Sequence, residues 1–216
     1  LSVRTILLLD NSPFNNFPIC SFISPLLLLF LVLTLSYNQP RFCLNTIWNS
    51  IATSFADQSF LGTDPHGIFV NSNNSIYVHV PNARTGEIRI WQNENHFNAT
   101  KTISSSLSAP YSMFVTTNGD IYVDNGGIKR VKKWIAENET WISVMNVPSQ
   151  CYGLFIDIYE NLYCSIGGIH RVDKNGSNIA GTGVGGSESD MLSGPYGIFV
   201  DINLDLYAAD CGNNRI

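Results

Sequence analysis

A short pattern that recurs four times constrains this chain more than any other feature of its sequence. Its clearest copy is Pro-Tyr-Gly-Ile-Phe-Val-Asp at residues 195–201, followed by Leu-Tyr-Ala-Ala-Asp at residues 206–210. Weaker copies begin at Pro65, Pro110 and Cys151, so the period is 45 residues (65 to 110), then 41 (110 to 151), then 44 (151 to 195). A period in the low forties is the length of a four-stranded propeller blade. The repeat therefore predicts an all-β fold built from such blades.

Each copy reads as a hairpin followed by two outer strands. The first two strands of a copy are short and rich in β-branched and aromatic residues, and a turn rich in Asn and Asp separates them. Third strands are expected at residues 87–91, 128–131, 169–172 and 214–216, and fourth strands at residues 100–103, 141–144 and 178–180. Four phenylalanines are expected at one buried position of successive first strands: Phe69, Phe114, Phe155 and Phe199.

The fourth copy, from Gly194 through Ile216, resembles the NHL repeat of β-propellers. The resemblance covers roughly residues 65–216, divided into 65–109, 110–149, 150–194 and a truncated 195–216. Other copies depart from it, because Ser112 replaces the glycine and Cys151 replaces the proline. The Ala-Asp pair of the fourth copy is also replaced, by His79-Val80 in the first copy and Ser165-Ile166 in the third.

About four blades are expected in this chain. A six-bladed ring at this period needs roughly 260 residues of repeat, so the chain is expected to be part of a longer product. The resemblance implies the fold strongly and the function weakly, because propellers of this kind serve enzymes, receptors and scaffolds alike.

The segment before the repeats has three parts. Residues 1–21 show no periodicity and are expected to be irregular. Residues 22–37 carry no charge and predict an apolar helix, which is interpreted as a signal peptide, an uncleaved transmembrane anchor or a buried core helix. The first two interpretations place the repeats on the lumenal or extracellular side. Residues 38–64 form a lead-in with an orphan strand at 44–50, which in a closed ring would complete the last blade.

The overall charge argues against a nucleic-acid partner. The net charge is −5 and the isoelectric point is about 5.2, whereas nucleic-acid binders show a basic face. The basic run from Lys129 to Lys133 is interpreted as a solvated outer strand.

Two kinds of modification are predicted inside the repeats. Asn-x-Ser/Thr sequons in turns or loops suggest glycosylation at Asn73, Asn98, Asn138 and Asn175. Cys151 and Cys164 share one hairpin, and either a disulfide or two buried thiols fits them. If Asp157 faces Leu162 across the turn, Cys164 faces Phe155, and a disulfide then needs a bulge or a bent strand entry.

No catalytic set emerges from the residues. Some propellers related by the resemblance are lyases that bind a metal through histidines at the central channel, and His66 lies at the entry to a first strand. The other copies place Tyr111, Tyr152 and Tyr196 there, so aromatic packing is the simpler interpretation. Asp157 and Asp201 are expected to cap turns. No metal or cofactor site is expected.

The combined expectation is a binding protein of unknown ligand. It would be a secreted or membrane-anchored propeller that binds a protein or a glycan and is not an enzyme. The alternative is a metal-dependent enzyme of the lyase or hydrolase type.

Overall fold

The computed structural model describes residues 6–8, 53–62, 65–71, 74–80, 86–92, 99–104, 107–108 and 110–216. Their strands form antiparallel sheets, and three of these sheets have four strands each. The first such sheet contains β3 (His66–Val70), β4 (Ile76–Val80), β5 (Glu87–Trp91) and β6 (Lys101–Ser104). The second contains β7 (Met113–Val115), β8 (Ile121–Asn125), β9 (Arg130–Ile135) and β10 (Thr140–Asn146). The third contains β11 (Gly153–Ile156), β12 (Leu162–Ile166), β13 (Arg171–Lys174) and β14 (Ser177–Ala180).

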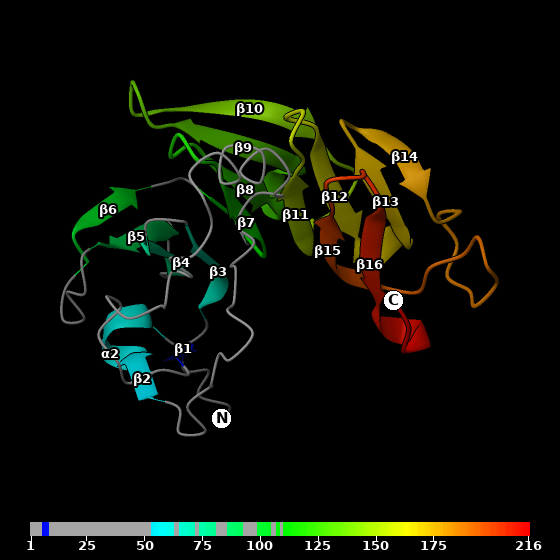
Figure 1. Ribbon diagram of the computed structural model, residues 1–216, viewed down its shortest axis with the longest axis horizontal. Helices are drawn as coiled ribbons and strands as arrows, with labels where there is room; N and C mark the ends of the chain where they lie inside the picture. The colour runs from blue at the N-terminus through cyan, green and yellow to red at the C-terminus, as the bar shows by residue number, and fades with distance from the viewer. Residues whose placement is uncertain are drawn as a thin grey trace, which may run out of the picture.

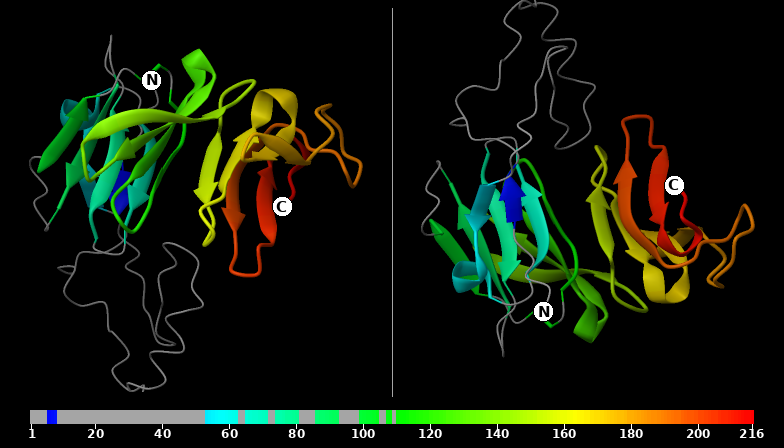
Figure 2. Two further views of the ribbon diagram at one scale, coloured as in Figure 1. Left: turned by 90° about the horizontal axis from the view of Figure 1, so that it is seen from above. Right: turned by 90° about the horizontal axis from the view of Figure 1, so that it is seen from below.

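The fourth repeat forms a two-stranded sheet of β15 (Pro195–Val200) and β16 (Leu206–Asp210). The first strands of successive repeats contact one another in the order β3, β7, β11, β15, and the sheets fan out from them (Figures 1 and 2). Each sheet therefore corresponds to one sequence repeat with its first strand innermost. This is the arrangement of propeller blades.

One turn geometry joins the first two strands of every repeat. The residue three positions after the one that opens the turn has a positive φ in each copy: Asn74, Gly119, Glu160 and Leu204. The residue that opens the turn also makes the same two backbone hydrogen bonds each time. In the third repeat, the carbonyl of Asp157 accepts from the N–H of Glu160, and the N–H of Asp157 donates to the carbonyl of Asn161. The carboxylate of Asp157 accepts from the N–H groups of Tyr159 and Asn161, and Asp201 does the same in its own turn. Both aspartates therefore cap turns, as the sequence predicts.

The third strand of the first repeat, β5, lies at the expected residues, but the third strands of the second and third repeats, β9 and β13, begin two residues later than expected. A short 3-10 turn precedes this position in the last three repeats: η3 (Gly126–Ile128), η4 (Gly167–Ile169) and η5 (Cys211–Asn213). Each ends at a left-handed residue, namely Lys129, His170 or Asn214. Strands β9 and β13 start only after that residue, and residues 214–216 contribute a single bridge between Asp210 and Arg215. The apolar Ile128 and Ile169 look like strand residues in sequence, but they belong to these turns.

The expected phenylalanine row is present. Consecutive ring centroids along Phe69, Phe114, Phe155 and Phe199 lie 5.1, 5.2 and 5.2 Å apart in edge-on contact. Phe114 and Phe155 are buried, while Phe69 and Phe199 are partly buried and pack against the same core. The row connects all four inner strands, so the core is continuous from one blade to the next.

The N-terminal expectations are tested only in part. Residues 1–21 are not wholly irregular, because strand β1 (Ile6–Leu8) pairs with β2 (Thr53–Ala56). A short helix, α2 (Gln58–Leu61), begins after Asp57, whose carboxylate caps it. The predicted apolar helix at 22–37 and the orphan strand at 44–50 lie outside the described residues. Among the residues that are described, no helix combines the length and apolar character needed to span a membrane.

Candidate functional site

Aromatic side chains form a continuous arc where the inner strands begin. We call His66, Tyr111, Tyr152 and Tyr196 the aromatic arc. Consecutive ring centroids lie 4.9, 5.0 and 4.7 Å apart along this order. All four residues hold the second position of their repeat, so the stacking follows directly from the contact between inner strands. Aromatic packing at this position is what the sequence predicts.

The arc is partly open to solvent. Tyr196 is 51% exposed and Tyr111 is 36% exposed, whereas Tyr152 in the middle is half-buried. Burial raises the pKa of Tyr152, and the nearby Tyr111, Tyr196 and Asp124 raise it further. The raised pKa means that the Tyr152 phenol is neutral at physiological pH.

A buried carboxyl group lies close to the arc. Asp124, at the fourth position of β8, is 0% exposed, and neither carboxylate oxygen makes a hydrogen bond. Burial raises its pKa to about 7, although backbone N–H groups of Cys151, Tyr111 and Gly126 act in the opposite direction. These N–H groups are near enough to affect the charge without being aligned for hydrogen bonds. The carboxyl group is therefore able to gain or lose a proton near neutral pH.

The equivalent position of β4 holds a buried histidine. His79 is opposite His66 in the β3–β4 pairing, and neither ring nitrogen of His79 has a hydrogen-bond partner. Burial, together with the nearby charge of His66, lowers its pKa to about 4. His79 is therefore neutral at physiological pH. Two histidines do meet here, but the described residues contain no cluster of three potential ligands that could hold a metal ion.

Sequence reasoning did not single out the fourth position of the second strand. Its occupants are His79, Asp124, Ser165 and Ala209, so three of four copies place a polar residue inside an apolar run. The Ser165 hydroxyl donates to the backbone carbonyl of Tyr196 in the next blade. The polar interruptions were visible in the sequence, and they mark the residues that face the start of the following inner strand.

The cysteines of the third repeat are joined. Cys151 and Cys164 form a disulfide with a Cα–Cα distance of 5.3 Å. The register differs by one residue from the one assumed, because Ile156 faces Leu162 and Cys164 faces Leu154. The chain bends just before β11, where Tyr152 donates its N–H to the carbonyl of Ser165. This bend brings Cys151 across to Cys164 and fixes the segment that carries Tyr152.

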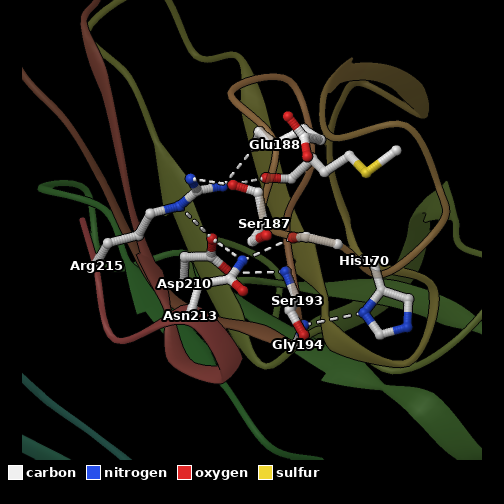
Figure 3. Close-up of polar contacts among 10 residues, drawn as sticks. His170, Ser187, Glu188, Ser193, Gly194, Asp210, Asn213 and Arg215 are labelled. Atoms are coloured by element: carbon white, nitrogen blue, oxygen red, sulfur yellow. Dashed lines mark hydrogen bonds and ion pairs between the residues drawn. The ribbon is translucent and has the colours of Figure 1, made fainter.

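The loop before the last member of the arc is held by Arg215 (Figure 3). Its guanidinium donates to the backbone carbonyls of Ser187, Glu188 and Met191 and pairs with Asp210 at 2.8 Å. On the other side of this loop, Nδ1 of His170 accepts the backbone N–H of Gly194 at 3.0 Å. The segment leading to Tyr196 is thus anchored at both ends.

Two of the four sequons lie within the described residues. Asn175 uses both ends of its side-chain amide, accepting from the N–H of Leu162 and donating to Asn161. Asn138 lies in the exposed β9–β10 turn, and its Oδ1 accepts from the hydroxyl of Thr140. Asn73 and Asn98 lie outside the described residues.

Comparisons with known proteins support the fold and leave the family open. No family model and no curated protein matches the chain. Among solved structures, an auxiliary nutrient binding protein from Bacteroides thetaiotaomicron aligns with a TM-score of 0.56 and 14% identity, over 77% of this chain and 49% of its own. A streptogramin B lyase aligns with a TM-score of 0.53 and 14% identity, over 69% of this chain and 49% of the lyase. A putative gluconolactonase aligns with a TM-score of 0.52 and 12% identity, over 73% of this chain and 60% of its own.

These solved structures are β-propeller proteins, and the chain shares their fold. It spans about half the length of the nutrient binding protein and of the lyase. The neighbours include both a binding protein and enzymes, so the fold is compatible with both functions considered above.

Proposed function

We propose that the chain is an NHL-type propeller that acts as a secreted or membrane-anchored binding module. Its ligand, a protein or a glycan, would lie on the aromatic arc. The arc itself is the observation that supports this proposal. Large aromatic side chains with partly exposed rings are enriched in binding surfaces, because each buries much area with little loss of conformational freedom.

The secretory route is supported by three features of the chain. Residues 22–37 have the composition of a targeting or anchoring segment. Disulfides such as Cys151–Cys164 persist in oxidising compartments. Asn138 offers an exposed sequon in a hairpin turn, so we expect a glycan there in preference to Asn175, whose amide holds a turn.

Expression in a eukaryotic secretory host tests this route. We expect the protein to carry a glycan at Asn138, removable by an N-glycosidase, and the variant Asn138→Gln to lose it. Cytosolic accumulation without any glycan would contradict both the route and the sequon assignment.

Screening against glycan arrays and extracellular protein libraries tests the binding function. Binding should be lost in Tyr152→Ala, which removes the middle of the arc. Tyr159→Ala is the matched control, because Tyr159 is 69% exposed in the turn at the far end of the same blade. Equal loss in both variants, or none in Tyr152→Ala, would exclude the arc as the binding surface.

The second candidate function is enzymatic. A carboxyl group whose pKa is about 7 is suited to general acid or base catalysis at neutral pH, and Asp124 is such a group. His66 and His79 would have to hold a metal with ligands supplied from elsewhere. Metal analysis of the full-length protein tests this candidate, because a metal-free sample without lyase or hydrolase activity excludes it.

A further inference from the structure

Asp124 differs from every other buried carboxylate in the described part of the chain. Five aspartates are buried there: Asp120, Asp124, Asp157, Asp173 and Asp210. Four of them have a basic partner. The closest N–O distances are 2.7 Å for Asp120 and Lys133, 3.9 Å for Asp157 and Lys174, 2.8 Å for Asp173 and Arg171, and 2.8 Å for Asp210 and Arg215. Asp124 has neither an ion pair nor a hydrogen bond. Buried charges are normally paired. The Asp124 carboxylate therefore lacks the cationic partner that the other four buried aspartates have.

The unpaired carboxylate lies against the aromatic arc. The backbone N–H of Asp124 donates to the carbonyl of Ser112, the residue that follows Tyr111. The Ser112 hydroxyl in turn donates to the carbonyl of Cys151, the residue that precedes Tyr152. The faces of aromatic rings are also electron-rich and attract cations. The aromatic rings and the Asp124 carboxylate therefore both favour a cation at the arc.

We propose that the aromatic arc binds an organic ammonium group and that Asp124 is its buried counter-charge. This inference rests on the proposed binding function and names the chemical class of the ligand. The ammonium would lie against the exposed parts of Tyr111 and Tyr196, which pack on either side of Tyr152. Asp124 would attract it through the low-dielectric interior without direct contact, because its own oxygens are inaccessible to solvent.

Binding of a cation should depend on pH. A bound ammonium favours the ionised carboxylate, so it lowers the pKa of Asp124 and displaces a proton. The other titratable groups near this carboxylate are the phenols of Tyr111, Tyr152 and Tyr196. Burial raises the pKa of Tyr152, so its phenol stays protonated at neutral pH. Affinity should therefore rise as the pH increases from 6 to 8.

Choline and 3,3-dimethylbutan-1-ol have nearly the same shape, but only choline carries a positive charge. Comparing their affinities therefore measures how much the charge contributes to binding. Titrations of the full chain, followed by NMR signals of the tyrosine rings, should show choline binding at least about tenfold more tightly than the isostere. Shifts should be confined to the arc tyrosines, with Tyr159 unaffected. Equal affinity for the two compounds, or no shift of the arc signals, would overturn the inference.

Two variants test the role of the carboxylate. Asp124→Asn keeps the shape of the side chain and should weaken choline binding about tenfold and abolish its pH dependence. The control, Asp205→Asn, removes an exposed carboxylate in the turn between β15 and β16 and should change neither. If Asp124→Asn binds choline as tightly as the unchanged protein does, Asp124 is not the counter-charge.

A measurement without any variant covers the case in which Asp124→Asn fails to fold. The carboxyl carbon of Asp124 should titrate at a lower pH when choline is saturating than when it is absent. An unchanged titration would overturn the inference.

The source of the ammonium follows from a second probe. N-acetyl-lysine methylamide carries a primary ammonium, so tighter binding of this probe indicates a protein ligand, and tighter binding of choline indicates a small quaternary amine. Failure of both probes would overturn the ammonium assignment alone, while the comparison of Tyr152→Ala with Tyr159→Ala still tests the arc as a binding surface.

Discussion

The hydroxyl of Ser112 donates a 2.8 Å hydrogen bond to the backbone carbonyl of Cys151, across the boundary between the second and third blades. Both residues are departures from the repeat, since Ser112 replaces a glycine and Cys151 a proline. Replacing proline also creates a backbone N–H, and this N–H acts on the carboxylate of Asp124. The side chain of Cys151 is bonded to Cys164. The two departures are therefore joined to each other across the blade boundary, and the disulfide ties them to the second strand of the third blade.

Removing the Ser112 hydroxyl should destabilise the protein. Ser112→Ala leaves the buried carbonyl of Cys151 without its side-chain donor, at a cost of about 1–3 kcal/mol in unfolding free energy. Ser143→Ala, at an exposed position of β10, is the matched control and should change it by less than about 0.5 kcal/mol. Urea denaturation measures both, and equal effects would mean that the bond between blades contributes nothing.

The disulfide should stabilise the third blade. Cys151 and Cys164 are 13 residues apart in sequence, and a closed loop of that size is worth about 3 kcal/mol. The double variant Cys151→Ala/Cys164→Ala should lose about this much, whereas Cys211→Ser, at an exposed free thiol, should lose little. Peptide mapping of unreduced protein should find Cys151 linked to Cys164. Any other pairing of Cys151 would contradict the structure.

The phenylalanine row should be sensitive to truncation at its centre. Phe155 is in ring contact with both Phe114 and Phe199 and is 6% exposed. Phe155→Ala should therefore lower the unfolding free energy by about 3–5 kcal/mol. Ile158→Ala, in the exposed turn that follows β11, should cost less than about 1 kcal/mol. A loss of similar size at both positions would show that Phe155 is not in the core.

The blades were predictable because their signals are local and repeated. Asn or Asp turns and the apolar pairs around them located the first two strands of every copy, and the phenylalanines identified the buried face. The third strand of the first repeat was placed correctly. Those of the second and third repeats were placed two residues too early, because Ile128 and Ile169 are apolar and β-branched, yet they lie in 3-10 turns. Only the left-handed residues that follow, Lys129 and His170, reveal where those turns end, and a lysine does not signal that conformation in a sequence.

The candidate site was only half predictable. The arc follows from one repeated position, so sequence periodicity was enough to find it. Asp124 was missed because its importance depends on which buried carboxylates have cations, and partners such as Arg215 for Asp210 are known only from the fold. The disulfide depended on the bend at Tyr152, which no repeat pattern encodes.

Asp124 and His79 should have opposite effects on stability as the pH changes. The folded-state pKa of Asp124 is raised to about 7, so the folded protein holds this proton more tightly and stability falls as the pH rises from about 4 to 7. The folded-state pKa of His79 is lowered to about 4, so the unfolded chain holds that proton and stability rises between about 4 and 6.5. In the unchanged protein the two trends oppose each other.

Single variants should separate the two trends. In Asp124→Asn, melting temperature should rise from pH 4 to pH 6.5, because the effect of His79 is no longer opposed. In His79→Gln, it should fall from pH 4 to pH 7. Melting curves across this range measure both slopes, and parallel curves for the two variants would contradict the assigned pKa shifts.

The ligand is predicted to bind on the aromatic arc. Tyrosine footprinting, by limited iodination of the full chain with and without a captured ligand, tests this directly. We predict that the ligand protects Tyr111 and Tyr196 and leaves the exposed Tyr159 as reactive as before. Protection of Tyr159, or unchanged reactivity of Tyr111 and Tyr196 at a saturating ligand concentration, would contradict it.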